Sequence, residues 1–390
     1  MRIAINSWFW NEPTTGSGQY TRRLVERLAA TAPDLEIVLV APEGQITNFQ
    51  SSITNHQFSI SDFHFQSSSR YRLPAALDKV RFEQIIFPRA CRCLEADVAH
   101  APYWAPPLQP SVPTVVTIHD LIPLLLREYR GGPLVRLYTA LVSQAAHGAA
   151  LVITDSEASR RDIVAHLGLP VERVHVVYLA ADKKYAPAPA PDDKAIRARY
   201  GLPERYALYL GGFDARKNIA TVLGIYRWAE PAIGDECPLV IAGRLPERDT
   251  EFAPDPRRLA QEQEIDKDCV HFTGFVNEVH KPALYRGAAA FIFPSRYEGF
   301  GLPPLEALAC GTPVVGSDVS SLPEVVGDAG VLLPPDDVEG MAGALIQLAT
   351  DKNFRTELSR RALAQAARFS WERAARETLA VYRDAVTGAI

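Results

Sequence analysis

The chain has 390 residues, of which 47% are hydrophobic and 22% are charged, and its formal net charge is −5 at pH 7. A chain of this length is expected to form two domains of similar size, and its composition is that of a soluble globular protein. The weak negative charge gives no general attraction to nucleic acid, and no run of eighteen apolar residues predicts a membrane-spanning helix. These bulk properties argue against a nucleic-acid-binding or integral membrane protein.

The N-terminus and the cysteines predict a cytoplasmic location. Residues 1–6 read directly as a first strand and lack the basic region and long apolar stretch of a signal peptide. The five cysteines are scattered, which predicts no disulfide framework and fits a reducing compartment. Cys91 and Cys93 are close in sequence but have no neighbouring metal-ligand partners, so no metal site is expected there.

Short apolar runs alternate with amphipathic stretches along the whole chain, a pattern typical of the α/β class with parallel sheets and crossover helices. The expected strands are, in chain order, residues 3–6, 36–40, 98–100, 114–118, 151–154, 206–210, 239–242, 270–272, 290–293, 313–315 and 331–332. These runs do not alternate between apolar and polar residues, as expected for strands that are buried on both faces.

The expected boundary between the two halves is the stretch 184–193, in which prolines alternate with alanines. Such a stretch cannot form a helix or a central strand, so it predicts a semi-rigid linker. The predicted domains are therefore 1–183 and 184–369. A terminal helical stretch, 370–390, begins at Ser370, which is a good N-cap residue.

The most informative segment carries Glu298 and Glu306, which are eight residues apart and follow an expected strand. Gly301 lets the backbone turn sharply, and Pro303 and Pro304 suit the first turn of a helix. The segment therefore predicts a strand, a glycine-rich loop and a helix whose start can offer N–H donors to an anion. A sugar nucleotide needs both donors for phosphate and carboxylate acceptors for hydroxyls, although solvated carboxylates at a helix start are the alternative.

Residues 293–307 resemble the signature of glycosyltransferase family 4, in which two glutamates are separated by seven residues. The segments 311–315, 322–326 and 328–332 are also similar to that family. The resemblance implies the GT-B fold, in which two Rossmann-like domains face a central cleft and the terminal helix crosses back to the N-terminal domain. It also implies retaining glycosyl transfer from a nucleotide sugar, without a metal or other cofactor.

The same resemblance implies roles for the signature residues. Glu306 would accept hydrogen bonds from the ribose hydroxyls, and Glu298 would contact the sugar or stabilise its oxocarbenium-like state. Backbone groups of Phe300, Gly301 and Leu302 would bind sugar or phosphate oxygens. The departing phosphate oxygen would accept the acceptor's proton, so no separate base is expected.

A loop after the first expected strand contains Gly16 and Gly18 and leads into a helix. Glycines permit close approach of the backbone to a phosphate, and a helix start supplies N–H donors. Family members use this loop near the donor pyrophosphate and the acceptor, so both glycines are candidate nucleotide-sugar contacts. A simple strand–helix turn is the alternative interpretation.

His119 and Asp120 follow the strand expected at 114–118. Histidine can donate or accept a hydrogen bond and can carry charge near pH 7. A family histidine at this point lies against the donor sugar, so His119 is a candidate catalytic residue and Asp120 a candidate acceptor contact. The alternative is a histidine satisfied at a strand end, and His100 is a weaker candidate for the cleft wall.

The segment 209–218 resembles the family stretch in which an arginine and a lysine neutralise the donor diphosphate. Lys217 matches the lysine, but Gly212 occupies the usual arginine position. Paired cations would stabilise the departing diphosphate. We expect Arg216 or Arg244 to supply the second charge, with an exposed surface arginine as the alternative for each.

The segment 270–276 is similar to the family stretch that borders the nucleobase. Phe275 or Val276 would pack on the face of the base, while backbone groups read its edge. The side chains do not distinguish guanine from uracil.

The first half of the chain is expected to present the acceptor. Residues 70–92 are basic with interleaved apolar residues. This pattern fits a surface helix that packs on its own domain, and it also fits peripheral contact with the inner face of an anionic membrane.

The overall prediction is a retaining glycosyltransferase that moves a hexose, first mannose from GDP-mannose, to a glycan or lipid-linked sugar acceptor in polysaccharide or glycoconjugate biosynthesis. The donor rests on similarity of the segment 211–218 to mannosyltransferases of the family. A UDP-glucose-type enzyme, a nucleotide-sugar epimerase on the same fold and an inactive sugar-nucleotide-binding homologue are the alternatives. Acceptor identity, linkage and oligomeric state are not readable from the sequence.

Overall fold

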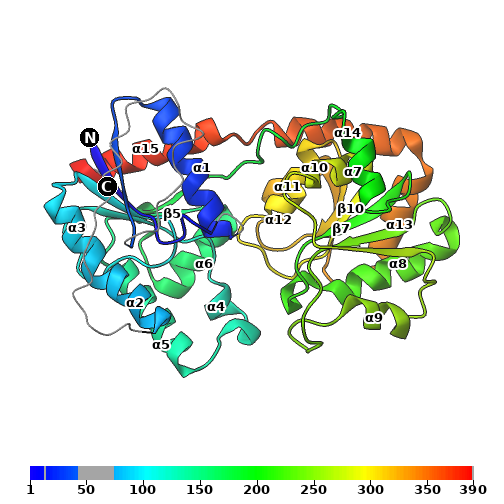
Figure 1. The fold of residues 1–390 in the computed structure, drawn as a ribbon, viewed down its shortest axis with the longest axis horizontal. Helices are drawn as coiled ribbons and strands as arrows, with labels where there is room; N and C mark the ends of the chain where they lie inside the picture. Colours follow the sequence, from blue (N-terminus) through cyan, green and yellow to red (C-terminus); the bar gives the residue numbers. More distant parts are fainter. Residues whose placement is uncertain (13–14, 43–73, 389–390) are drawn as a thin grey trace. The chain divides into compact units, whose positions relative to one another are not determined.

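The structure is a computed structural model that describes residues 1–12, 15–42 and 74–388. The chain forms two compact units, each built around one parallel sheet with helices (Figure 1). Unit 1 comprises Met1–Tyr178 and Trp371–Ile390, and unit 2 comprises Leu179–Ser370. The described residues contain no helix that is both long and apolar enough to cross a membrane.

The sheet of unit 1 has six parallel strands in the order β2-β1-β3-β4-β5-β6. Its strands are β1 (Arg2–Asn6), β2 (Glu36–Val40), β3 (Val98–Ala101), β4 (Thr114–Thr117), β5 (Leu151–Thr154) and β6 (Val174–Val176). Its helices are α1 (Gly16–Thr31), α2 (Ala75–Arg81), a π-helix (Phe82–Ile86), α3 (Phe87–Cys93), α4 (Ile122–Leu125), α5 (Pro133–Ala146), α6 (Glu157–Leu167) and α15 (Trp371–Thr387), with 3-10 turns at Arg127–Tyr129 and Val171–Arg173.

Helix α15 comes from the far end of the sequence and lies beside α1 within unit 1 (Figure 1). The ring centroids of Trp371 and Tyr20 are 6.3 Å apart. Further along α15, the Tyr382 hydroxyl lies 2.7 Å from Nδ1 of His100 in β3. Both ends of the helix are therefore fixed to the core of this unit.

The sheet of unit 2 has six parallel strands in the order β12-β11-β10-β7-β8-β9. Its strands are β7 (Tyr206–Leu210), β8 (Leu239–Ala242), β9 (Val270–Gly274), β10 (Ala288–Phe293), β11 (Val314–Ser317) and β12 (Gly330–Leu333). Its helices are α7 (Asp193–Arg199), α8 (Ile219–Ile233), α9 (Pro256–Glu262), α10 (Lys281–Gly287), α11 (Leu302–Ala309), α12 (Leu322–Val326), α13 (Val338–Thr350) and α14 (Lys352–Ala366), with 3-10 turns at Ala215–Lys217 and Gly327–Ala329.

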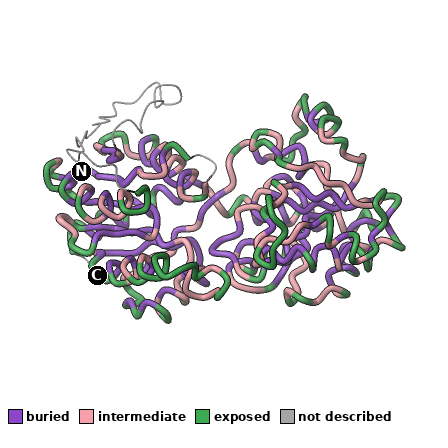
Figure 2. The backbone as a smooth tube through the Cα atoms, turned by 60° about the horizontal axis from the view of Figure 1, so that its bottom comes forward, coloured by how far each residue is buried: buried purple, intermediate pink, exposed green. Residues whose placement is uncertain are grey.

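The central strand β7 shows why the apolar runs do not alternate with polar residues. Tyr206, Leu208 and Leu210 belong to the hydrophobic core on one face of the sheet, whereas Ala207 and Tyr209 belong to the core on the other face. Successive side chains of a strand point to opposite faces, so a strand covered on both sides must be apolar throughout. The buried strands form the interior of each unit in Figure 2.

The predicted α/β class with two parallel sheets is confirmed, and the eleven expected strands all form. The structure adds the edge strand β6, which the sequence analysis did not predict. Its short run is interrupted by His175 and is only partly buried, so it gives no apolar signal.

The proline-rich stretch that was predicted to be a linker lies within unit 2, and the boundary falls between Tyr178 and Leu179. Tyr185 is buried, with its ring centroid 5.9 Å from that of Tyr285. Asp193 accepts a hydrogen bond of 2.7 Å from Nε of Arg286. These contacts hold the stretch on the surface of unit 2.

In each sheet the chain begins with an inner strand, adds strands on one side of it and later adds strands on its other side. In unit 1 the partners of β1 are β2 on one side and β3 on the other, and in unit 2 the partners of β7 are β8 and β10. Loops that leave two such neighbouring strands diverge, and ligands of open α/β sheets bind there, beyond the carboxyl ends of the strands. The loops after β7 and β10, and those after β1 and β3, are therefore the places to search for sites.

Candidate functional site

Lys217, Arg216 and Glu298 come together at the carboxyl ends of β7 and β10. Nζ of Lys217 lies 2.6 Å from Oε1 of Glu298, and Nη1 of Arg216 lies 2.9 Å from the same oxygen. The side chains of Lys217 and Glu298 are each 9% exposed. Arg216 also pairs with Asp214, whose Oδ1 lies 3.2 Å from its Nε. We call these four residues the cation–carboxylate cluster.

The cation–carboxylate cluster keeps Glu298 ionised. Burial raises the pKa of the Glu298 carboxyl, but the charges of Lys217 and Arg216 outweigh burial and hold this pKa below its usual range. Burial lowers the pKa of Lys217, whose ammonium lies 4.8 Å from the ring centroid of Phe293. Two cations and two carboxylates balance in charge, so an incoming diphosphate would exchange with carboxylates that already hold the cations in place.

Two serines position the loop that carries Glu298. The backbone N–H of Glu298 donates to Oγ of Ser320 at 2.9 Å, and Oγ of Ser321 donates to the carbonyls of Glu298 and Phe300 at 2.9 and 2.6 Å. Ser320 has φ of +51°, a conformation that L-residues rarely adopt. The sequence analysis missed both serines, because nothing in the sequence marks them as hydrogen-bond partners of a loop twenty residues away.

The loop after Glu298 exposes backbone rather than side chains. Phe300 is buried, with its ring centroid 5.8 Å from that of Phe369, so only its backbone can reach a ligand. Gly301 has φ of +109° and precedes α11, which begins at Leu302. Pro303 and Pro304 have no N–H, so the first-turn donor of this helix is the N–H of Leu302.

Glu306 lies on α11 in surroundings that favour its protonated form. Burial raises the pKa of its carboxyl to about 7, a shift that Lys281 opposes and Glu278 reinforces. The Tyr285 hydroxyl donates to Oε2 of Glu306 at 3.1 Å. The buried Tyr185 hydroxyl lies near the same carboxyl and, like the Tyr285 hydroxyl, acts to lower its pKa. A buried carboxyl surrounded by hydroxyl groups is suited to a ligand that brings further hydroxyl groups.

The structure separates the two residues expected at the nucleobase. Phe275 is 57% exposed, and the guanidinium of Arg244 lies 5.2 Å from its ring centroid. Val276 is 4% exposed and is part of the core of unit 2. Only Phe275 can therefore offer a side-chain surface to a base, and Arg244 lies beside Phe275 rather than in the cation–carboxylate cluster as far as the described contacts show.

In unit 1, the loop after β1 uses its glycines in different ways. A Cβ on Gly18 would lie 2.2 Å from the carbonyl oxygen of Glu12, so close packing of the chain against itself requires a glycine there. A Cβ on Gly16 would meet nothing within 4 Å. The side chain of Thr15 caps α1 by accepting from the N–H of Gly18 at 3.2 Å. Residues 13 and 14 lie outside the described residues.

His119 lies at the end of β4 and is held by a carboxylate that the sequence analysis did not predict. Its Nδ1 lies 2.6 Å from Oδ2 of Asp155, which follows β5, while its buried Nε2 has no hydrogen-bond partner. Burial lowers the pKa of His119, but Asp155 outweighs burial, so the net shift is upward. Asp120 accepts from the N–H of Ile122 at 3.0 Å and thereby orders the turn after His119.

His100 does not line a site, and its prediction as part of the cleft wall is wrong. It is fully buried, and its two ring nitrogens lie 2.8 Å from Oγ1 of Thr117 and 2.7 Å from the Tyr382 hydroxyl. Burial lowers its pKa to about 3, so it is a neutral core residue.

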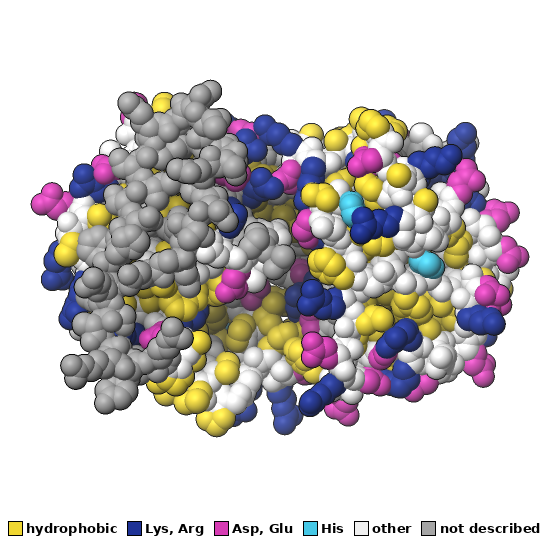
Figure 3. Space-filling model, in the orientation of Figure 1, with side chains coloured by type: hydrophobic (Ala, Val, Ile, Leu, Met, Phe, Trp, Pro, Cys, Tyr) yellow, Lys and Arg dark blue, Asp and Glu magenta, His cyan; other side chains and the backbone are white. Residues whose placement is uncertain are grey.

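Residues 70–73 of the basic stretch lie outside the described residues, and the remainder forms α2, the π-helix and α3. Phe82 and Phe87 are buried in the core of unit 1, whereas Leu77 and Ile85 are exposed. The apolar face of this stretch thus packs mainly on its own unit. Further exposed apolar side chains lie on α5, at the lower left of Figure 3.

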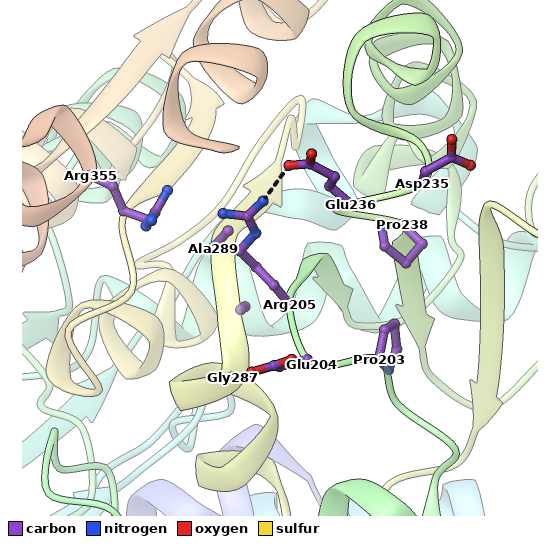
Figure 4. A pocket seen from close by; sticks show the side chains of 10 residues that line it. Pro203, Glu204, Arg205, Asp235, Glu236, Pro238, Gly287, Ala289 and Arg355 are labelled. Carbon is purple, nitrogen blue, oxygen red and sulfur yellow. Dashed lines mark hydrogen bonds and ion pairs between the residues drawn. The ribbon is translucent and has the colours of Figure 1, made fainter. Parts of the chain in front are cut away.

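A pocket of about 750 Å³ lies in unit 2, and its lining includes Arg205, Glu236, Pro238, Ala288 and Arg355 (Figure 4). Apart from Arg355 on α14, its residues precede or begin β7, β8 and β10, so it lies at the amino ends of the strands, opposite the cation–carboxylate cluster. No predicted site residue lines it. Among the described residues, no group of three or more histidine, cysteine, aspartate or glutamate side chains is arranged to hold a metal ion.

Comparison with known proteins gives the same class as this fold and site. The family descriptions "Glycosyltransferase Family 4" and "Glycosyl transferases group 1" match residues 14–185 and 192–365. The Escherichia coli protein named O-antigen chain mannosyltransferase B is 32% identical over 380 residues, which are 95% of this chain and 96% of that protein.

Solved glycosyltransferase structures share the fold. Sucrose-phosphate synthase from Thermosynechococcus elongatus has a TM-score of 0.75 at 22% identity, with complete coverage of both chains. Anabaena HepE in complex with UDP-glucose has a TM-score of 0.69 at 17% identity, covering 97% of this chain and 99% of that one. The fold is thus that of the GT-B glycosyltransferases.

The chain belongs to glycosyltransferase family 4, with the glycosyl transferases group 1 match in its second half. It is accordingly an enzyme, a hexosyltransferase of that family.

Proposed function

We propose that this protein transfers mannose from GDP-mannose, with retention of anomeric configuration, to a glycan acceptor during assembly of a bacterial surface polysaccharide. The similarity to a protein named as an O-antigen mannosyltransferase, which extends over nearly the whole of both chains, supports the donor and the pathway class. The observation that carries the proposal is the cation–carboxylate cluster, which sits beyond the carboxyl ends of β7 and β10, where ligands of such sheets bind.

Within unit 2, Lys217 and Arg216 would bind the diphosphate of the donor and stabilise the charge that develops on it as the glycosidic bond breaks. Gly212 occupies the position of the family arginine, and Arg216 rather than Arg244 would supply the missing charge. Arg216 is favoured because it contacts the same carboxylate oxygen as Lys217. Glu298, when released from these cations, would accept hydrogen bonds from sugar hydroxyls. Glu306 would bind the ribose diol.

In unit 1, His119 would donate a hydrogen bond to the donor sugar. The carboxylate of Asp155 fixes Nδ1 as a donor and leaves Nε2 pointing to no protein partner. With its pKa raised, the ring would carry a proton on Nε2 and donate it in a hydrogen bond to a sugar oxygen. The proton of the attacking acceptor hydroxyl would pass to the departing phosphate oxygen on the same face, which retains the configuration.

Lys217 and Arg216 would also make a divalent ion unnecessary, because they supply the positive charge that a metal would otherwise bring to the diphosphate. Transfer measured in the presence of a chelator tests this point. We expect an unchanged rate, and loss of activity that is restored by magnesium or manganese would contradict the proposal.

Peripheral contact with an anionic membrane through residues 70–92 is a separate proposal. It is supported by the exposure of Leu77, Ile85, Arg89 and Arg92 within this stretch. Co-sedimentation with vesicles containing anionic lipid, compared with neutral vesicles, would test it.

A panel of nucleotide sugars distinguishes the proposed donor from its alternatives. We expect GDP release from GDP-mannose that is faster than UDP release from UDP-glucose, and an α-linked product by NMR. Conversion of the sugar without any acceptor would favour an epimerase. Binding without release of nucleotide would favour an inactive homologue, and inversion at the anomeric carbon would contradict the retaining mechanism.

A further inference from the structure

Aromatic side chains gather at the other divergence of loops, where β1 and β3 end. Trp8 and Phe9 follow β1, Tyr103 and Trp104 follow β3, and Tyr138 comes from α5. The ring centroids of Phe9 and Tyr103 are 4.9 Å apart in an edge-to-face arrangement. Tyr103 is buried and the other four rings are partly exposed. We call these five residues the aromatic cluster.

An ion pair between the partly exposed Lys79 and the buried Glu83 lies inside the aromatic cluster. Nζ of Lys79 lies 2.5 Å from Oε1 of Glu83 and 2.6 Å from the Tyr138 hydroxyl. The same ammonium is 4.6 Å from the ring centroid of Tyr138, 5.0 Å from that of Tyr103 and 5.7 Å from that of Phe9. Glu83 is fully buried on the π-helix, an irregularity frequently found at functional sites. The pair is neutral in sum.

Two buried N–H donors of this region have no hydrogen-bond partner, namely Nδ2 of Asn6 and Nε1 of Trp104. Asn6 is 0% exposed, and its Oδ1 accepts from the Tyr103 hydroxyl at 3.1 Å, which places its amide against the aromatic cluster. Buried polar groups in native proteins are nearly always paired, so unpaired donors need an explanation. A ligand with hydroxyl groups would supply the missing acceptors.

Structural packing alone accounts for part of this arrangement, since Lys79 and Glu83 tie α2 to α5 through Tyr138. It does not account for rings left partly exposed around a polar centre, or for two unpaired donors at the position where ligands bind in such sheets. We propose that the aromatic cluster is a subsite that binds a neutral pyranose residue of the acceptor glycan.

The chemistry of the subsite selects the class of ligand. Flat aromatic rings present apolar surface to the C–H faces of a pyranose, while a few placed polar groups fix its orientation. Because Glu83 already neutralises Lys79, an uncharged sugar fits better than a uronic acid or a phosphorylated sugar. The inference that this sugar belongs to the acceptor rests on the proposed function, whereas the inference that the subsite binds a neutral sugar does not.

The first experiment measures sugar binding without any nucleotide. Tryptophan fluorescence is titrated with methyl α-mannopyranoside and with neutral mannose and glucose trisaccharides, in the wild-type protein and in Trp104→Phe and Tyr138→Phe. We expect a saturable change with at least one neutral sugar and a dissociation constant raised about three- to tenfold in Trp104→Phe, as for loss of one neutral hydrogen bond. We also expect a raised dissociation constant in Tyr138→Phe, because the Tyr138 hydroxyl holds Lys79 and Glu83 in place. Trp228→Ala is the matched control, because Trp228 is an exposed tryptophan on α8 of unit 2.

The second experiment places the sugar in the reaction. For Trp104→Phe and Tyr138→Phe, we expect a higher KM for the acceptor and an unchanged dissociation constant for the nucleotide sugar measured without acceptor. Equal binding of every neutral sugar by the wild-type protein and both folded variants, or no binding at all, would overturn the subsite. Sugar binding in a protein that releases no nucleotide from any nucleotide sugar would contradict the proposed function and leave the subsite standing.

Discussion

His119 and Asp155 form a hydrogen bond of 2.6 Å between the ends of two neighbouring strands, β4 and β5. The carboxylate fixes Nδ1 of His119 as a hydrogen-bond donor, so under the proposed function it would act on the sugar through His119. We expect Asp155→Asn to lower kcat with little change in the KM of the donor, and His119→Ala to lower kcat at least as much. Steady-state kinetics at several pH values would show it, and an unchanged kcat in both variants would remove His119 from the site.

The same pair makes stability depend on pH. The folded-state pKa of His119 lies above its ordinary value of 6.5, so the ion pair stabilises the fold fully below about pH 6.5 and this contribution is lost as the pH rises through the folded pKa. Urea unfolding should therefore give a steeper loss of stability above about pH 6.5 in the wild-type protein than in Asp155→Asn. His166→Gln serves as the control, because His166 is exposed on α6.

Lys217 and Arg216 should both contribute to diphosphate affinity. We expect Lys217→Ala and Arg216→Ala each to weaken GDP binding by roughly 1.5–3 kcal/mol, the cost of losing one charged hydrogen bond. Calorimetric titration measures this, with Arg205→Ala as a control at the opposite end of the strands. Full retention of nucleotide binding in Lys217→Ala would contradict the role of the cation–carboxylate cluster.

Glu298→Gln should mainly reduce turnover. The variant keeps a side chain of the same shape but leaves the buried Lys217 and the partly buried Arg216 without their shared charge. We therefore expect a lower kcat, together with a loss of stability of about 3 kcal/mol, as for a broken buried ion pair. Thermal unfolding measures the loss of stability, and titration with nucleotide measures binding. If the variant only removes the carboxylate that competes for the cations, nucleotide binding will strengthen rather than fail.

Glu306 should make donor affinity depend on pH. Its pKa of about 7 means that the carboxylate, which would bind the ribose hydroxyls under the proposed function, forms only as the pH rises through neutrality. We expect the affinity for GDP-mannose, whose diphosphate does not titrate there, to increase from about pH 6 to about pH 8, and this slope to disappear in Glu306→Gln. The same shift affects stability, because the pKa of Glu306 in the folded protein lies above its ordinary value of 4.5. Its contribution to the free energy of unfolding is fully present below about pH 4.5 and is lost as the pH rises through about 7.

Gly16 and Gly18 should respond differently to alanine. Gly18→Ala puts a methyl group against the Glu12 carbonyl, so we expect a large drop in the melting temperature. Gly16→Ala meets open space and should fold normally. If the loop contacts the donor or acceptor as predicted, Gly16→Ala will still lower activity; normal kinetics in this variant would argue against that contact.

The strands and the glutamate segment were predictable because their signals are local. Five apolar residues in succession, as in β7, predict a strand buried on both faces, and the loop–helix after β10 follows from its glycines and prolines. Membership in the family then rested on a continuous stretch of residues. Strand β6 was not predicted, because a histidine interrupts its three residues.

The partners of the site residues were not predictable, because they depend on which strands become neighbours. Asp155 follows β5 just as His119 follows β4, but only the sheet order brings them together. Burial likewise decides which candidates can reach a ligand. His100 and Val276 are buried in the core, whereas Phe275 is exposed, and the sequence gives no sign of this difference. A search for polar residues at the ends of all the expected strands would have found Asp155.

Helix α15 also imposes an order on the maturation of the chain. Unit 2 is one continuous segment, whereas unit 1 needs residues that are synthesised after all of unit 2. Until Tyr382 has been synthesised, Nδ1 of His100 lacks its hydroxyl partner. The surface of α1 against which Trp371 packs remains exposed to solvent. The half of the enzyme that is translated first thus cannot complete its core before the last helix has been made.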